Sequence, residues 1–93
     1  MDSIREALDE YRTQIDYVDE QLLAYLAKRF ELSQSIGLIK REANVGIVQS
    51  DRAQAVEERY IQLGTRHGLQ RHFVTELFSL IHEESCRIQS SGE

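Results

Sequence analysis

The sequence predicts an all-α protein in which one very long helix and two shorter helices form an intertwined homodimeric bundle. Three observations support this fold class. The chain has no proline and only five glycines in 93 residues, so little interrupts helix formation. Apolar residues recur at helical spacing in three segments, and no alternating pattern typical of strands competes with them. The first segment is also too long for a compact monomer of this size.

The first predicted helix covers residues 3–41. This stretch contains a single glycine, Gly37, and helix-forming residues throughout. Steps of three and four residues from Leu8 trace one heptad seam, the pattern of a helix that packs against a partner helix. One cation, Arg29, lies on this face. The seam consists of Leu8, Tyr11, Ile15, Val18, Leu22, Tyr25, Arg29, Leu32, Ile36 and Ile39.

The second predicted helix covers residues 50–64. The Asn-Val-Gly segment at 44–46 breaks the first helix, because asparagine and glycine favour turns. Ser50 then offers an N-cap and Asp51 an acidic first turn. Gly64 is expected to end this helix.

The third predicted helix covers residues 70–89 and follows a short connection with the sequence TRHG. Its apolar positions recur at helical spacing, so the chain is expected to end in a helix. These positions are Val74, Leu77, Phe78, Ile81 and Ile88.

The length of the first helix predicts the dimer. At about 1.5 Å per residue it spans roughly 55 Å, whereas a compact chain of this size has a radius of gyration of about 12 Å. Two helices of about 15 to 20 residues cannot cover both ends of its seam, so a second copy is the natural partner.

Composition describes one small domain over residues 1–93, with 41% hydrophobic and 29% charged residues. The apolar runs are short and no signal-peptide pattern opens the chain, so neither secretion nor a membrane span is expected. A single cysteine, Cys86, fits a reducing compartment, and we expect a cytoplasmic protein. The net charge of −5 argues against nucleic-acid binding, which requires a basic face.

Neither a metal site nor a covalent nucleophile is predicted. His67, His72 and His82 show no ligand spacing with one another or with Cys86. Cys86 is expected to be a packed thiol without a neighbouring histidine or helix N-terminus to activate it. The serines and histidines form no recognisable nucleophile arrangement.

Polar side chains interrupt the helical faces at positions that can converge on one ligand. Arg12 and Arg29 share a face of the first helix but lie roughly 25 Å apart, so in an antiparallel dimer Arg12 of one chain can approach Arg29 of the other. Lys40 lies about 16 Å beyond Arg29, close to three full turns. The sequence therefore predicts two equivalent pockets for a small dianion. Each combines Arg12 of one chain with Arg29, Lys40, Arg52, Ser85 and Gln89 of the other.

A non-catalytic interpretation stays open from the residues alone. A cation on a heptad seam can set the register of a coiled coil or extend to solvent, and Ser85 and Gln89 can belong to a fraying helix end. On this hypothesis the chain is a helical dimerisation or regulatory module. Arg29→Leu would then keep or raise its stability.

The chain resembles the AroQ class of chorismate mutases over roughly residues 4–90. Members of this class are all-helical, domain-swapped dimers. No single matching stretch identifies this class, but the combination of stretches does. The matching stretches are RTQIDYVDEQLLAYLAKR at 12–29, GLIK at 37–40, Asp51 with Arg52, and LFSLIHEESCRIQ at 77–89.

This resemblance implies a Claisen rearrangement of chorismate to prephenate in aromatic amino acid biosynthesis, with no metal, no organic cofactor and no covalent intermediate. Such a reaction needs a flexible dicarboxylate held in its reactive conformer. Arg12 of the partner chain, Arg29 and Arg52 would hold the carboxylates. Ser85 would be an auxiliary donor.

The rearrangement also needs hydrogen-bond donors at the ether oxygen, where charge develops as the carbon–oxygen bond breaks. The resemblance assigns this role to Lys40 and Gln89. The expected catalytic residues are Lys40, Gln89 and Arg29, and the expected substrate-binding residues are Arg12, Arg29, Lys40, Gln49, Arg52, Ser85 and Gln89.

Two positions differ from the well-known bacterial mutases, in which acidic residues contact the substrate's ring hydroxyl. Gln49 stands three residues before Arg52, and Ala53 directly after it. Gln49 can still accept a hydrogen bond, but the missing carboxylate at 53 is expected to weaken binding by about 1 to 3 kcal/mol. Similar enzymes with a neutral residue there rearrange 4-amino-4-deoxychorismate, so that substrate stays open. Isochorismate pyruvate lyases share the fold and cations, with an expected shorter, proline-bearing loop between Lys40 and Arg52 that this chain lacks.

Overall fold

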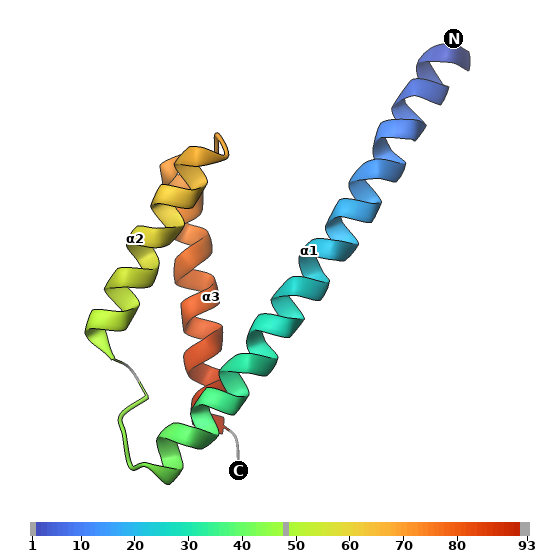
Figure 1. The fold of residues 1–93 in the computed structure, drawn as a ribbon. Coiled ribbons are helices and arrows are strands. Elements are labelled where there is room, and N and C mark those ends of the chain that lie inside the picture. The colour runs from blue at the N-terminus through green and yellow to red at the C-terminus, as the bar shows by residue number, and fades with distance from the viewer. Residues whose placement is uncertain (1, 48, 92–93) are drawn as a thin grey trace.

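The computed structural model describes residues 2–47 and 49–91, and these residues form three α-helices and no strand (Figure 1). The predicted all-α class is confirmed. Met1, Val48, Gly92 and Glu93, which belong to the domain predicted over residues 1–93, lie outside the described residues. The helices are α1 (Asp2–Glu42), α2 (Ser50–Arg66) and α3 (Arg71–Ser91).

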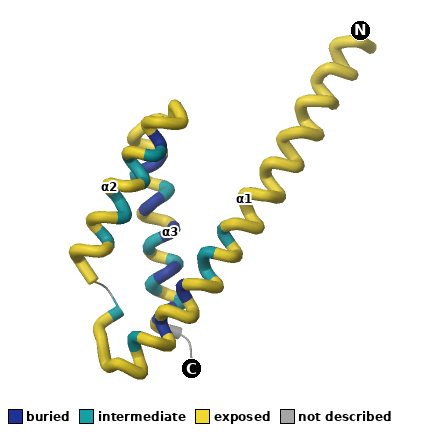
Figure 2. Tube along the Cα trace, in the orientation of Figure 1, coloured by how far each residue is buried: buried dark blue, intermediate teal, exposed yellow. Residues whose placement is uncertain are grey.

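The N-terminal half of α1 stands away from the rest of the chain as a long arm (Figure 1). The molecule measures 63 × 28 × 15 Å and has a radius of gyration of 17.8 Å, against about 12 Å for a compact chain of this size. Every residue from 2 to 25 is exposed, as Figure 2 shows. Among the described residues, no helix combines the length and the apolar character that a bilayer span requires.

Asn44 ends α1 by adopting a left-handed conformation with φ 58°. Its N–H donates to the Arg41 carbonyl at 3.2 Å, and the Val45 N–H donates to the Lys40 carbonyl at 2.8 Å. These two bonds form a Schellman motif, in which asparagine is one of the few residues that replace glycine. The break predicted at 44–46 therefore falls where the chain turns toward α2.

Gly68 ends α2 in the same way, so the predicted end at Gly64 is wrong. Gly68 has φ 75°, and its N–H donates to the Thr65 carbonyl at 3.1 Å, while the Leu69 N–H donates to the Gly64 carbonyl at 2.8 Å. Only glycine adopts this conformation without steric cost. The helix consequently extends past Gly64 to Arg66.

Gly64 instead allows α2 and α3 to pack closely. It is buried, and a Cβ added there would lie 2.6 Å from Val74 Cγ2. Val74 is a core residue together with Phe78 and Ile81, and the Phe78 ring meets Tyr60 of α2 edge-to-face with centroids 5.3 Å apart. This small core holds α2 antiparallel to α3 (Figure 1).

Gly37 likewise allows α1 and α3 to pack closely. It is buried, and a Cβ added there would lie 2.8 Å from Gln89 Cα and 3.0 Å from the Gln89 carbonyl oxygen. The absence of a side chain at Gly37 thus lets the end of α1 cross the end of α3 at backbone distance. This crossing places the polar face of α1 over Gln89.

Candidate active site

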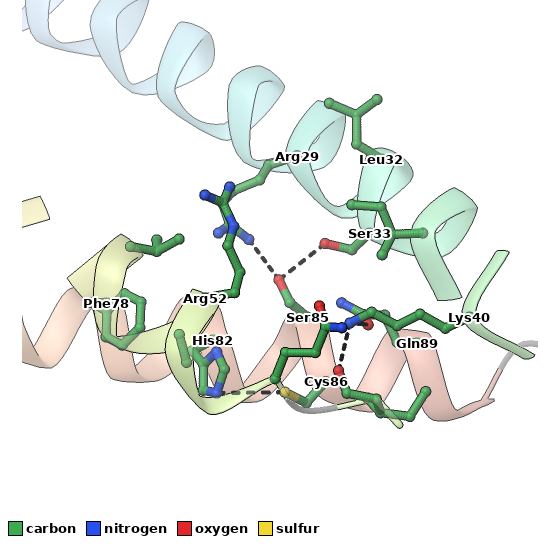
Figure 3. Close-up of a pocket in the computed structure, with 15 residues that line it drawn as sticks. Arg29, Leu32, Ser33, Lys40, Arg52, Phe78, His82, Ser85, Cys86 and Gln89 are labelled. Carbon is green, nitrogen blue, oxygen red and sulfur yellow. Dashed lines mark hydrogen bonds between the residues drawn. The ribbon is translucent and has the colours of Figure 1, made fainter. Parts of the chain in front are cut away.

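A cavity of about 450 Å³ lies where the three helices meet (Figure 3). Three of its lining residues are cations, and no carboxylate of the described chain lines it. Its electrostatic character therefore suits an anion. Six of the seven predicted substrate-binding residues line this cavity: Arg29, Lys40, Gln49, Arg52, Ser85 and Gln89.

Ser85 joins α3 to α1 on one side of the cavity. Its hydroxyl accepts hydrogen bonds from Arg29 Nη1 at 2.6 Å and from Ser33 Oγ at 3.1 Å. Both serines are 5% exposed, so the bond between them is shielded from water, and the bond from Arg29 is partly buried. They fix the Arg29 guanidinium, whose other N–H groups can meet an anion. Ser33 was not predicted, although it lies four residues after Arg29 on the same helix face.

Lys40 and Gln89 form a second polar group. Lys40 Nζ donates to Gln89 Oε1 at 2.9 Å and to the Ile47 carbonyl at 2.6 Å. Arg41 Nη1 donates to the Gln89 carbonyl at 2.6 Å, which ties the end of α3 to α1. Because Gln89 Oε1 is occupied, the amide hydrogens on Nε2 remain as donors for a ligand. Arg41 and Ile47 were not predicted, since a contact made through a backbone carbonyl leaves no pattern in residue type.

Gln49 and Arg52 bring α2 into the site. Gln49, not the predicted Ser50, is the N-cap of α2, and its side chain makes no capping hydrogen bond. Arg52 is exposed, and Figure 3 shows its side chain reaching toward Arg29. Neither guanidinium is paired with a carboxylate in the part of the chain that the structure describes. Two such groups close together suit a ligand with carboxylates.

Arg12 is the one predicted site residue that the single chain keeps apart from the others. It lies on the exposed arm of α1, roughly 25 Å along the helix from Arg29. Its side chain is 69% exposed and approaches the Asp9 carboxylate at 3.9 Å. A contact with the cavity therefore requires Arg12 of another copy.

His82 and Cys86 also line the cavity, and neither was predicted as a site residue. Cys86 Sγ lies 3.7 Å from His82 Nε2, so the prediction that Cys86 has no neighbouring histidine is wrong. The four-residue spacing between His82 and Cys86 in the sequence indicates this contact, because it places both side chains on one helix face. No group of three or more His, Cys, Asp or Glu among the described residues is arranged to hold a metal ion.

The ion pair between Glu84 and Arg87 lies on α3 outside the cavity lining. Arg87 Nε and Nη2 donate to the two carboxylate oxygens at 2.8 and 2.6 Å. The hydrogen bond from Arg87 lowers the pKa of Glu84, and the same bond raises the pKa of Arg87. Because solvent screens this surface pair, it adds little to the field in the cavity.

The arrangement suits holding and orienting a small dianion. Two guanidinium groups, from Arg29 and Arg52, are available for carboxylates, and Lys40 of α1 with Gln89 of α3 offers a second set of donors in the same cavity. Such a site accelerates a reaction by fixing the reactive conformer and by stabilising charge that develops next to the donors. Apolar side chains complete the walls: Leu32, Ile36, Ile47, Val56 and Phe78.

Comparison with known proteins gives a consistent result. Residues 11–90 match the family model described as chorismate mutase type II. The bifunctional chorismate mutase/prephenate dehydratase of Escherichia coli (strain K12) is 40% identical over 80 residues, which make up 86% of this chain and 21% of that protein. A bifunctional relative of the same name from Buchnera aphidicola subsp. Baizongia pistaciae is 32% identical over 87 residues, 94% of this chain and 24% of the relative.

The chain thus spans about a fifth to a quarter of the length of these bifunctional relatives. A relative of similar size is the 4-amino-4-deoxychorismate mutase of Streptomyces venezuelae. It is 29% identical over 82 residues, which are 88% of this chain and 80% of that protein.

Proposed function

Because the chain belongs to the chorismate mutase type II family, we propose that it rearranges chorismate to prephenate in the cytoplasm, as a step of aromatic amino acid biosynthesis. The observation that carries the proposal is the cavity in which Arg29, Lys40 and Arg52 surround a ligand-sized space without a carboxylate among the described lining residues. Chorismate is a dicarboxylate, so its charges complement these cations. The rearrangement is pericyclic and needs neither a metal nor an organic cofactor.

The guanidinium groups bind the two carboxylates in this proposal. Arg29 is already aimed by its 2.6 Å bond to Ser85, so little side-chain freedom is lost when it meets the substrate. Ser85 accepts hydrogen bonds from Arg29 and Ser33 and keeps its own hydroxyl hydrogen as an auxiliary donor. Holding the substrate at both carboxylates favours the folded conformer in which the reacting carbons meet. Orientation of this kind can supply about 7 to 11 kcal/mol of a barrier.

Lys40 and Gln89 stabilise the transition state. As the ether carbon–oxygen bond breaks and the new carbon–carbon bond forms, negative charge develops on the ether oxygen. Lys40 Nζ and Gln89 Nε2 can both donate to that oxygen. The 2.9 Å bond between Lys40 and Gln89 Oε1 orders the two side chains before the substrate binds, so the donors need little reorganisation during the reaction.

The functional unit is a homodimer in which Arg12 of a second copy completes each cavity. The seam on the arm of α1 is exposed, including Leu8, Ile15 and Leu22. An apolar face of this length on a free monomer is unfavourable in water, and a second copy would cover it. In an antiparallel pair, the arm of each copy extends toward the cavity of the other.

Turnover of chorismate by the purified protein tests the proposed reaction. The loss of the ultraviolet absorbance of chorismate gives the rate, and product analysis identifies prephenate. We expect saturable turnover far above the uncatalysed rate. A Lys40→Ala preparation, purified in parallel, controls for a mutase from the expression host. Turnover at the uncatalysed rate, or an equal rate in both preparations, would refute the proposal.

A second candidate substrate is 4-amino-4-deoxychorismate. Neutral Gln49 and Ala53 line the cavity, and the Streptomyces venezuelae relative is named for that substrate. Charge favours chorismate, because a protonated amino group would enter a cavity that holds three cations and would be repelled by them. A competition between the two compounds at equal concentration decides the substrate. A preference of about tenfold or more for the amino compound, equivalent to roughly 1.4 kcal/mol, would reverse our assignment.

A further inference from the structure

His82 is a polar side chain of the cavity to which the proposed mechanism gives no role. It is half-buried on α3, and its ring stacks on Phe78 with centroids 5.4 Å apart and an interplanar angle of 16°. Its Nε2 lies 3.7 Å from Cys86 Sγ. In Figure 3 the ring lies between Phe78 and Cys86, with the other nitrogen on the edge turned toward Arg52. The imidazole is therefore held by its own helix, with Nδ1 available to a ligand.

Most other hydrogen-bond acceptors of the cavity are already engaged. Ser85 Oγ accepts from Arg29 and from Ser33, and Gln89 Oε1 accepts from Lys40. No carboxylate is present among the described lining residues. A ligand hydroxyl that needs an acceptor can turn to Gln49, which is exposed at the start of α2, or to the half-buried imidazole. A neutral imidazole can accept or donate, according to its tautomer.

The helix packing places His82 at the apolar end of the cavity. Phe78 contacts Tyr60 across the antiparallel α2–α3 pair. One turn further along, Val56 of α2 is therefore level with His82 of α3, and both line the cavity. The cations lie on α1 and at the start of α2. A carbocyclic ring is expected at the apolar end, with its carboxylates directed toward the cations.

We propose that His82 hydrogen-bonds the polar substituent on the substrate's ring and thereby helps to determine which substituent the site accepts. This inference rests on the proposed function. A ring hydroxyl buried against Phe78 and Val56 without a partner would be unfavourable, since an unsatisfied buried polar group costs about 1 to 3 kcal/mol. The weak thiol contact to Cys86 leaves the imidazole free to take the tautomer that the substituent requires. His82 is thus a specificity-determining residue.

Changing the side chain and the substituent together tests this contact. The kcat/KM values of wild type, His82→Phe and His82→Gln are measured with chorismate and with an analogue in which hydrogen replaces the ring hydroxyl. His82→Phe keeps an aromatic ring against Phe78 and removes both nitrogens. We expect it to lower kcat/KM for chorismate about tenfold, the effect of one hydrogen bond, and to change the value for the analogue less than about twofold. His82→Gln, which keeps an acceptor, should recover most of the loss.

The matched control is His72→Leu, which removes an exposed histidine whose Nε2 lies 3.2 Å from Glu76 on the same helix. It should leave both substrates unchanged. An equal loss for both substrates in His82→Phe would overturn the inference, because it would indicate a role in packing or in carboxylate binding. If His82→Phe does not fold, His82→Leu provides the same comparison. Wild-type protein without chorismate turnover would overturn the proposed function and the inference together, whereas normal turnover without a substituent-selective loss would overturn the inference alone.

Discussion

Arg29 lies on the apolar face of α1, where a cation has no carboxylate partner among the described residues. The residue is half-buried, and its guanidinium donates to the buried Ser85 hydroxyl. A cation removed from water without a counter-ion reduces the stability of the fold, and an anionic ligand can compensate for that loss. The residue is therefore better explained by ligand binding than by stability, although setting the register of a coiled coil would also place a cation there.

Arg29→Leu separates these two roles. We expect equal or higher stability, because an apolar side chain suits the seam, and a loss of about 10- to 100-fold in kcat/KM for chorismate, the effect of a hydrogen bond to a charged group. Urea unfolding and steady-state kinetics measure the two quantities. Lys28→Leu is the matched control, since Lys28 is an exposed neighbour that approaches Glu31 at 4.0 Å and lies outside the cavity. Undiminished activity in Arg29→Leu would favour the register hypothesis.

Lys40→Ala probes the donors at the ether oxygen. If Lys40 acts mainly in the transition state, kcat should fall by about 10²- to 10³-fold, and KM should change much less. Steady-state kinetics across a range of chorismate concentrations provides both values. A large rise in KM with unchanged kcat would mean that Lys40 only binds the substrate in its ground state.

At the scale of the elements, two glycines govern how closely the helices approach. Gly37 faces the backbone of Gln89, and Gly64 faces the side chain of Val74. The first close approach sets the geometry of the cavity, because Gln89 is bonded to both Lys40 and Arg41. The second close approach packs α2 against α3, and neither Gly64 nor Val74 lines the cavity.

Gly37→Ala should therefore reduce activity by more than its loss of stability alone would explain. Its Cβ would meet Gln89 Cα at 2.8 Å, so α3 must shift and the amide of Gln89 with it. We expect a fall in kcat of the folded protein of about tenfold or more, since small misplacements are costly in catalysis. Gly64→Ala is the comparison: it overpacks the core, with a typical cost of about 1 to 3 kcal/mol in stability, and should leave kcat of the folded fraction unchanged. Equal kcat in both variants would contradict this division of roles.

The helices themselves could be predicted from the sequence, but the C-terminal ends of two of them could not: α2 ends at Arg66 rather than Gly64, and α3 ends at Ser91 rather than Gln89. Periodic apolar residues predict three helices, and the structure has three among its described residues. Glycine is common just after the last turn of a helix, and on that basis the sequence predicts a helix end at Gly64. Glycine also allows two helices to pack closely, and only the position of Val74 in the fold shows that Gly64 has this role rather than ending the helix. Gly68, four residues later, adopts the positive φ that a helix-ending glycine requires.

At the scale of the whole molecule, the sequence predicted which side chains of one chain lie together. Helical spacing places Arg29 and Lys40 on one face of α1, and the polar positions Arg52, Ser85 and Gln89 bring α2 and α3 into the predicted pocket. Residue spacing places Ser33 on the face of Arg29 and His82 on the face of Cys86, but it does not show that these faces line the cavity, which depends on how the helices pack. Arg41 was missed because its contact with the Gln89 carbonyl depends on how α1 and α3 cross. The family was predicted correctly, while the roles of the site residues remain predictions.

The exposed arm of α1 leads to a prediction about assembly. Leu22→Glu places a charge on the seam, far from the cavity in the same chain, and should shift the protein toward monomers and lower its activity with them. Sedimentation at several protein concentrations measures the assembly. Gln21→Glu adds the same charge one residue away from the seam and should leave the dimer intact. A wild-type protein that is active as a monomer would contradict the prediction.

The central claim is that each site takes Arg12 from one chain and the other cations from its partner, and a heterodimer tests it most directly. Arg12→Ala and Arg29→Ala chains are coexpressed with different tags, and the mixed dimer is purified by both tags. If the sites are shared, one of its two sites is intact, so activity should be about half that of wild type while each variant alone is nearly inactive. A purified heterodimer no more active than the two variant homodimers would contradict the shared site.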